Sequence, residues 1–254
     1  MDGFKRSRFK AKLTSGHDVT HDVYTRGAGP VVVIIQELPG IGPQTLRLAE
    51  LFDEQGFTVV LPHLFGPLGK TSLLGNTARV FCMRREFRLF AKGKTSPIVG
   101  WLRALCQDLK AAHQVEGVAV IGMCLTGNFA ISLMADEAVL AAVASQPSMP
   151  IGGAKHIHMA PDDIEVVHER LEEIGPMLAY RFEQDKLCRA EKFATLDAVF
   201  NDKQERIKLS TLPGPGHSVL TLDFVDKEGH PTRQALDEVL AYFRAALPAA
   251  EDSA

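Results

Sequence analysis

The stretch GVAVIGMCLTGNFAISLMA, residues 117–135, runs from an apolar strand pattern directly into a helical one, and Cys124 stands where the pattern changes. A side chain on such a turn is pushed out of the fold, and small residues two positions before and after it let the strand and the helix approach closely. Gly122 meets the first requirement, whereas Thr126 occupies the second position and Gly127 follows it. The stretch predicts Cys124 as a nucleophile on a sharp strand-to-helix turn.

The expected helix just after Cys124 bears on the reactivity of its sulfur. The free N–H groups and the positive dipole end of a helix N-terminus favour a thiolate over a thiol. The N–H of Leu125 is then placed to bind a developing oxyanion. Most free cysteines are buried and inert, and we interpret Cys82 and Cys106, inside or beside helical stretches, in that way. Cys124 differs from these two cysteines because it lies on the predicted strand-to-helix turn.

Composition indicates an ordinary globular protein, since 46% of the 254 residues are hydrophobic and 23% are charged. The net charge of −3 argues against a general nucleic-acid binder. The longest aliphatic run is Val31–Ile35, too short for a membrane span. The basic start, MDGFKRSRFKAK, lacks the apolar stretch of a secretory signal, and the four cysteines form no CxxC pair. We expect free thiols in a cytoplasmic protein.

Strand-like apolar runs alternate with helical patterns along the chain, and several runs are apolar on both faces, as in a covered parallel sheet. The predicted strands are 31–36, 57–61, 117–121, 139–144, about 177–182 and 205–212. The predicted helices lie near 43–55, 97–114, 125–136, 162–174, 187–200 and 231–247, and the first twenty-five residues add an antiparallel pair at one edge. No composition shift marks a boundary. The pattern predicts one α/β domain over residues 1–254, with a doubly wound, mostly parallel sheet flanked by helices.

Ligands of open α/β sheets bind outside the carboxyl ends of the strands, so reactive side chains there carry more weight than the same residues elsewhere. Cys124, Glu37, Asp185 and His217 all follow predicted strands. His217 lies in LPGPGHSVLTLDF, a loop in which prolines and glycines can hold an imidazole in one place. We therefore predict His217 as the base that serves the cysteine.

The acid that orients the imidazole should come between nucleophile and histidine in the chain. Asp185, in YRFEQDKLC, follows a strand and meets this order. Glu183 is an alternative two residues earlier. Asp162 and Asp163 open a helix, where aspartate is usually a cap. Asp185 is the preferred candidate.

Glu37 directly follows five aliphatic residues in VVVIIQELPGIG, where a carboxylate is poorly solvated unless it has a partner. It is either a group that interacts with the thiol or a capping or loop carboxylate. The N–H of Leu38 is the second expected oxyanion donor, because the loop after this strand supplies one in this architecture.

Five segments resemble the dienelactone hydrolases in order and spacing: VVVIIQELPGIG, VVLPHLFG, GMCLTGNFA, EQDKLC and GPGHSVL. The resemblance runs from about residue 18 to the C-terminal helix. It implies an α/β-hydrolase fold that opens an enol-lactone ring through a Cys–His–Asp triad without a metal. Cys124 would be the nucleophile, His217 the base and Asp185 its orienter. Glu37 would contact the resting thiol and help to generate the thiolate when substrate arrives.

Two positions depart from the family pattern. Thr126 stands where members usually have glycine, which could crowd the turn or shift the helix. Members that cleave dienelactone bind the substrate carboxylate with two arginines, one of which corresponds here to Arg84 or Arg85 in CMRREFRLF. The other position is Thr221, which cannot replace a bidentate guanidinium. The expected substrate is therefore a small carboxylic ester or lactone rather than dienelactone specifically.

The remaining histidines do not favour a metal site. His156 and His158 would share a strand face, and His17 and His21 have a helical spacing in a strand-like context, but neither pair has a third ligand. We expect no cofactor and no metal, a small-molecule substrate, no nucleic-acid or membrane partner, and a monomer or homodimer. A non-catalytic small-molecule-binding protein, or a thioesterase or peptidase with the same triad, remains an alternative.

Overall fold

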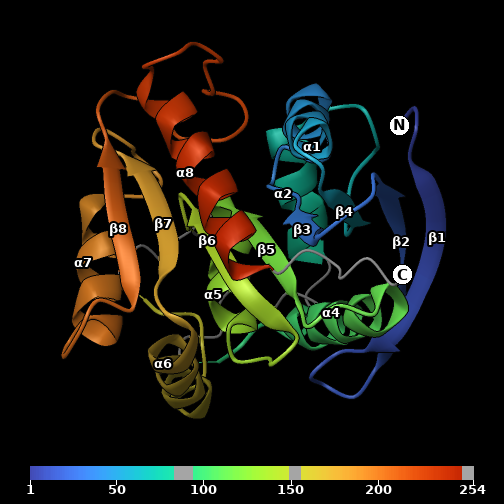
Figure 1. Cartoon of the computed structure of the whole chain (residues 1–254), viewed down its shortest axis with the longest axis horizontal. Helices are drawn as coiled ribbons and strands as arrows, with labels where there is room; N and C mark the ends of the chain where they lie inside the picture. Colours follow the sequence, from blue (N-terminus) through green and yellow to red (C-terminus); the bar gives the residue numbers. More distant parts are fainter. Residues whose placement is uncertain (83–93, 149–155, 248–254) are drawn as a thin grey trace.

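The computed structural model describes residues 1–82, 94–148 and 156–247, which build an eight-stranded sheet in the order β1-β2-β4-β3-β5-β6-β7-β8 (Figure 1). The strands are β1 (Lys5–Lys12), β2 (Asp18–Arg26), β3 (Val31–Ile35), β4 (Thr58–His63), β5 (Val118–Met123), β6 (Val139–Ser145), β7 (Met177–Phe182) and β8 (Ile207–Leu212). The helices are α1 (Pro43–Glu54), α2 (Leu73–Cys82), α4 (Ile98–His113), α5 (Gly127–Leu133), α6 (Pro161–Ile174), α7 (Ala190–Phe200) and α8 (Pro231–Ala246). A short 3-10 turn, η1 (Cys124–Thr126), joins β5 to α5.

The strands from β4 to β8 pair in parallel, and β1 and β2 add the expected antiparallel pair at one edge. The basic residues of β1 are mostly exposed. Arg6 reaches Asp22 of β2 at 2.7 Å, and Lys10 reaches Asp18 at 3.1 Å. The basic start of the chain is therefore a solvated edge strand.

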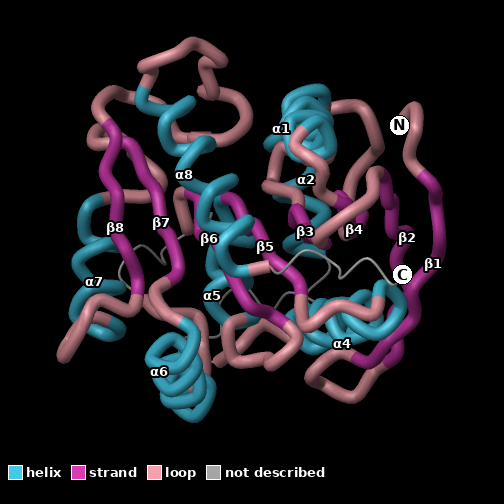
Figure 2. The backbone as a smooth tube through the Cα atoms, viewed as in Figure 1, coloured by secondary structure: helices cyan, strands magenta, loops and turns pink. Residues whose placement is uncertain are grey.

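Helices cover both faces of the sheet, as Figure 2 shows by colour. Alternate residues of one strand point to opposite faces. Val33 belongs to a core that includes side chains of α4 to α7, and Ile34 belongs to a second core that includes side chains of α1 and α8. Trp101 of α4 and Phe52 of α1 are fully buried in these two cores. The predicted doubly wound α/β architecture is confirmed.

Three of the boundaries that differ from the sequence predictions lie beside the predicted site residues. β5 continues to Met123, two residues past its expected end, so Gly122 lies inside the strand and Cys124 begins the turn at once. The helix that follows is shorter than predicted and starts at Gly127, because η1 precedes it. α7 starts at Ala190 instead of near 187, since the chain first wraps around the side chain of Asp185.

α2 was not predicted from the sequence. Its segment, LLGNTARVFC, is short and contains a glycine, so its helical pattern is weak. Tertiary contacts hold it: the Asn76 amide donates to the carbonyl of Pro39 at 3.1 Å, and the N–H of Ser72 bonds the same carbonyl at 2.9 Å. This helix is therefore fixed by the loop after β3 rather than by its own sequence.

Candidate active site

The parallel register brings the predicted site residues to one edge of the sheet. β3 and β5 pair as far as Ile35 and Gly122, and β7 and β8 pair as far as Phe182 and Leu212. The loops that follow these strands therefore open on the same side. Cys124, Glu37, Asp185 and His217 all lie in them.

Cys124 adopts a backbone conformation that marks a sharp turn. Its φ is +56°, a left-handed backbone conformation that residues other than glycine rarely adopt. The turn also brings the backbone of η1 against the strand, since a Cβ on Gly122 would lie 2.1 Å from the carbonyl oxygen of Thr126. Glycine is therefore required at position 122. Strain of this kind is typical of a nucleophile on a strand-to-helix turn.

Thr126 fits the turn without crowding it. Its hydroxyl accepts the N–H of Met123 at 2.9 Å and lies 3.0 Å from the Met123 carbonyl and 3.2 Å from the Ile35 carbonyl, to either of which it can donate. The side chain is fully buried. Threonine thus ties the cysteine turn to the end of β3 at the position where the family usually has glycine.

Asp185 and His217 form a pair in which the carboxylate is buried and the imidazole is partly buried. The carboxylate Oδ2 lies 2.7 Å from Nδ1 of His217, and Oδ1 accepts the N–H groups of Leu187 and Cys188 at 2.8 and 3.0 Å. Glu183, the alternative acid, is exposed. Both carboxylate oxygens of Asp185 are therefore engaged, and one of them fixes the orientation of the imidazole.

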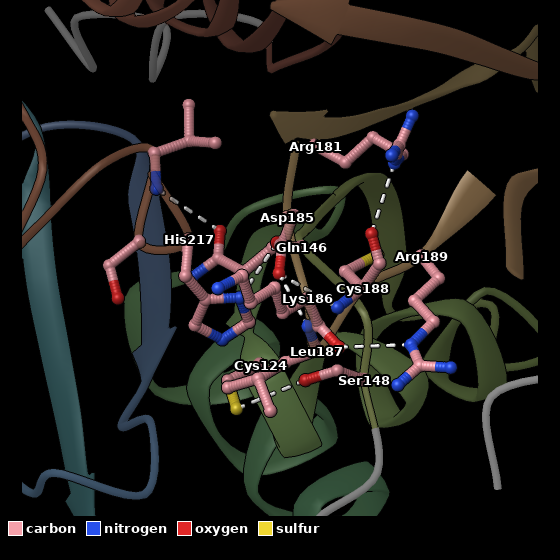
Figure 3. Close-up of polar contacts among 12 residues, drawn as sticks. Cys124, Gln146, Ser148, Arg181, Asp185, Lys186, Leu187, Cys188, Arg189 and His217 are labelled. Carbon is pink, nitrogen blue, oxygen red and sulfur yellow. Dashed lines mark hydrogen bonds and ion pairs between the residues drawn. The ribbon is translucent and has the colours of Figure 1, made fainter. Parts of the chain in front are cut away.

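The imidazole of His217 lies between the carboxylate of Asp185 and Cys124 (Figure 3). Burial lowers the pKa of His217, but the hydrogen bond with Asp185 and the interaction with Cys124 outweigh it and raise this pKa to about 10. Nε2 is buried and has no hydrogen bond of normal geometry to a described residue. The imidazole is thus held in its charged form with its free nitrogen toward the cysteine.

The sulfur of Cys124 contacts a residue that the sequence analysis missed. Its Sγ lies 3.2 Å from the hydroxyl of Ser148, as the dashed line in Figure 3 shows. Ser148 is buried and follows β6 by three positions. The signal that could have found it is the same one used for the other residues, a polar side chain just after a strand of the parallel sheet.

Glu37 does not make the contact that the family resemblance implies. Its carboxylate accepts hydrogen bonds from the hydroxyls of Ser218, at 3.0 Å, and Thr221. Burial raises the pKa of Glu37, and the two hydroxyls and His217 only partly oppose this. The thiol's partner is Ser148 instead. The family resemblance implies an arginine at position 221, but the Thr221 found there binds Glu37 instead.

The loop that carries His217 is held at several points. Asp223 Oδ2 accepts the N–H groups of His217 and Ser218 at 2.7 and 2.9 Å. Gly216 packs so closely on Phe182 that a Cβ there would lie 2.6 Å from the ring. Together with the bonds from Ser218 and Thr221 to Glu37, these contacts fix the loop on the N-terminal and the C-terminal side of His217.

The two expected oxyanion donors lie on neighbouring turns. Leu38 follows Glu37, and its N–H has no hydrogen-bond acceptor among the described residues. Leu125 lies in η1, directly after the cysteine. The bond from Thr126 to the Ile35 carbonyl brings the two turns together. Arg84 and Arg85, the candidates for a substrate carboxylate, lie outside the described residues.

Two of the other histidines named above make structural contacts. His21 packs edge-on against Trp101, with ring centroids 5.0 Å apart. The backbone carbonyl of His156 accepts the ammonium of Lys192 at 3.0 Å. Within residues 1–82, 94–148 and 156–247, no group of three His, Cys, Asp or Glu side chains is arranged to hold a metal ion. In the same ranges, no helix has the length and apolar character needed to cross a membrane.

Comparison with known proteins places this geometry in a family. The sequence model of the dienelactone hydrolase family matches residues 21–247. A search of curated proteins finds no match. Among solved structures, a dienelactone hydrolase from Anabaena variabilis has a TM-score of 0.61 at 15% identity, and the match covers 97% of this chain and 100% of that one.

Two further structures show the same fold. A cold-adapted esterase from an Arctic intertidal metagenomic library has a TM-score of 0.63 at 14% identity, with 98% of this chain and 96% of that one covered. A dienelactone hydrolase-like promiscuous phosphotriesterase from metagenomic libraries has a TM-score of 0.63 at 15% identity, with 96% and 99% covered. At such identities the similarity establishes the fold alone.

Proposed function

Because the chain belongs to the dienelactone hydrolase family, we propose that it hydrolyses small carboxylic esters or lactones with Cys124 as the nucleophile. The observation that carries the proposal is a thiol on a left-handed strand-to-helix turn beside an imidazole that a buried carboxylate orients. Nucleophile, acid and histidine follow one another in the chain in the order typical of α/β-hydrolases.

In the proposed reaction, the attacking group is the Cys124 thiolate, paired with the protonated imidazole of His217. The sulfur bonds to the ester carbonyl carbon, and the negative charge moves to the carbonyl oxygen, which the N–H groups of Leu38 and Leu125 bind. Each donor lowers the barrier by about 3 kcal/mol. The carbonyl then re-forms, the C–O bond breaks, and the alkoxide takes its proton from His217. A thioester on Cys124 remains.

The second half of the reaction restores the pair. Neutral His217 takes a proton from water, and the resulting hydroxide attacks the thioester carbonyl. The C–S bond breaks, the sulfur leaves as a thiolate, and His217 keeps the proton. Asp185 holds the imidazole in one orientation and stabilises its charged form throughout.

The contact between Thr221 and Glu37 supports uncharged esters as the preferred substrates. A guanidinium at position 221 would offer a carboxylate two parallel hydrogen bonds, whereas the hydroxyl there is already bound to Glu37. An activity of the carboxymethylenebutenolidase type, on an anionic lactone, would depend on Arg84 or Arg85. A screen of aryl esters and lactones with and without a free carboxylate decides between these substrate classes.

Substitution of the cysteine tests the proposal. Cys124→Ala should lower turnover of an activated aryl ester by at least about a thousandfold, because no other described thiol lies at the turn. Cys106→Ala, at a buried free thiol in the core, is the matched control and should retain activity. Full turnover by the Cys124→Ala variant would refute the proposal.

A further inference from the structure

Ser148 is fixed against the cysteine by its backbone as well as by its hydroxyl. Its N–H donates to the carbonyl of Cys124 at 3.0 Å, and its own carbonyl accepts the amide of Asn128 at 3.1 Å. The same amide nitrogen also reaches the carbonyl of Leu125 at 3.2 Å. Asn128 thus joins the segment after β6 to the cysteine turn, and the Ser148 hydroxyl sits at a defined place beside the sulfur.

The direction of the hydrogen bond follows from where the proton of the pair resides. Either the thiol or the hydroxyl could donate across the 3.2 Å separation. The form of the sulfur that attacks a carbonyl carbon is the thiolate, which has no proton and can only accept. The hydroxyl of Ser148 is then the donor.

We propose that Ser148 is a further catalytic residue, whose hydroxyl donates a hydrogen bond to the Cys124 thiolate and stabilises it before attack and again when it leaves the thioester. This inference rests on the proposed function. It has a clear physical basis, because Cys124 is only 5% exposed and its charge receives little help from water. A hydrogen bond to a charged group is stronger than one between neutral groups.

The hydrogen bond also lowers the nucleophilicity of the thiolate, and this effect makes the role of Ser148 measurable. When sulfur bonds to the acyl carbon its charge disappears and the bond from Ser148 weakens, so the hydroxyl stabilises the thiolate more than the attacking state. Removing it should leave less thiolate at low pH, but the thiolate that remains should be more nucleophilic. A purely structural defect would not produce these opposite effects at the two ends of the pH range.

The experiment measures alkylation of Cys124 by iodoacetamide, followed by mass spectrometry of the peptide that contains it. In Ser148→Ala, the rate near pH 6 should fall about tenfold, which corresponds to about 1.4 kcal/mol. Near pH 10 the rate should equal or exceed that of the unmodified protein. Ser148→Thr keeps a hydroxyl and should restore the rate near pH 6. Turnover of an aryl ester should fall in Ser148→Ala in parallel with the rate near pH 6.

Ser132→Ala is the matched control, since that buried hydroxyl donates to the backbone carbonyl of Asn128 on the same helix and does not reach the sulfur. It should leave the alkylation profile unchanged. An unchanged rate near pH 6 in Ser148→Ala would overturn the inference, and so would an equal loss in Ser132→Ala. Alkylation does not depend on turnover, so this failure is distinguishable from that of the proposed function, which appears as activity in Cys124→Ala.

Discussion

Asp185 and Glu37 are two buried carboxylates that hold the same histidine loop in different ways. Asp185 follows β7, is 5% exposed, and binds two backbone N–H groups and the imidazole of His217. Glu37 follows β3, is 2% exposed, and binds two hydroxyls. One carboxylate has a cationic partner and the other has only neutral donors.

The difference shows that the partners of a buried acid, rather than its burial, decide its chemical role. An imidazolium stabilises the Asp185 carboxylate, and the carboxylate in turn holds the proton on His217. Hydroxyl donors compensate less well for lost solvation, and burial therefore raises the pKa of Glu37. We infer that Asp185 serves the proton transfers of the reaction, whereas Glu37 positions the loop.

The largest effect should follow from removing the charge of Asp185. Asp185→Asn keeps the shape of the side chain but removes the negative charge that helps to raise the pKa of His217, so this pKa should fall toward its ordinary value of 6.5. We expect turnover of an aryl ester to fall by about 10³- to 10⁴-fold. NMR titration of the His217 ring in both proteins measures the pKa directly.

Glu183→Gln is the control for this substitution, because Glu183 is an exposed carboxylate two residues away. It should change neither turnover nor the titration of His217. Near-normal turnover in Asp185→Asn would contradict the role of Asp185 in orienting and charging His217. Asp185 and Glu37 would then show no difference in function.

A smaller effect on stability should follow from changing the partners of Glu37. Its pKa in the folded protein is raised above the ordinary value of 4.5, so its stabilising contribution is complete below that pH and is lost as the pH rises through the folded pKa. Thr221→Val removes one donor and raises this pKa further. We expect a loss of about 1–3 kcal/mol in the free energy of unfolding near pH 8, and a smaller loss near pH 4.

Glu37→Gln separates the charge of Glu37 from its shape. The variant cannot ionise at this position, so its stability relative to the unmodified protein should rise with pH above 4.5. His217 acts in a different window, since its contribution is complete below 6.5 and is lost as the pH rises through about 10. Urea unfolding of the variants at several pH values resolves the two windows. A Glu37→Gln variant that loses stability as the pH rises would contradict the pKa direction assigned to Glu37.

The sequence was sufficient for the order of the strands because the central strands β3, β4, β5 and β6 each contain a run of aliphatic residues. It failed at α2, whose helix depends on bonds from Asn76 and Ser72 to Pro39, contacts that have no local pattern. It also placed the end of β5 two residues early, directly before Gly122. The predicted role of this glycine agrees with the structure, in which its missing side chain makes room for the carbonyl of Thr126.

The residues at the site were predictable in kind but not in their pairings. Position after a strand singled out Asp185 and His217, which the structure brings together at 2.7 Å. The partners of Glu37 and of the sulfur depend on side-chain directions in the segments that follow four different strands, β3, β5, β6 and β8, and no spacing in the chain encodes these. Ser148 was overlooked because serine after a strand is common and has chemical meaning only beside the sulfur.

The most direct test of the account is to identify the atom that carries the acyl group. The protein is mixed with an activated aryl ester, quenched in acid within milliseconds, and analysed by mass spectrometry of its peptides. We predict an acyl group on the peptide that contains Cys124, and none on that peptide in the Cys124→Ala variant. Acylation of a different residue, or turnover without any acyl group on Cys124, would contradict the account.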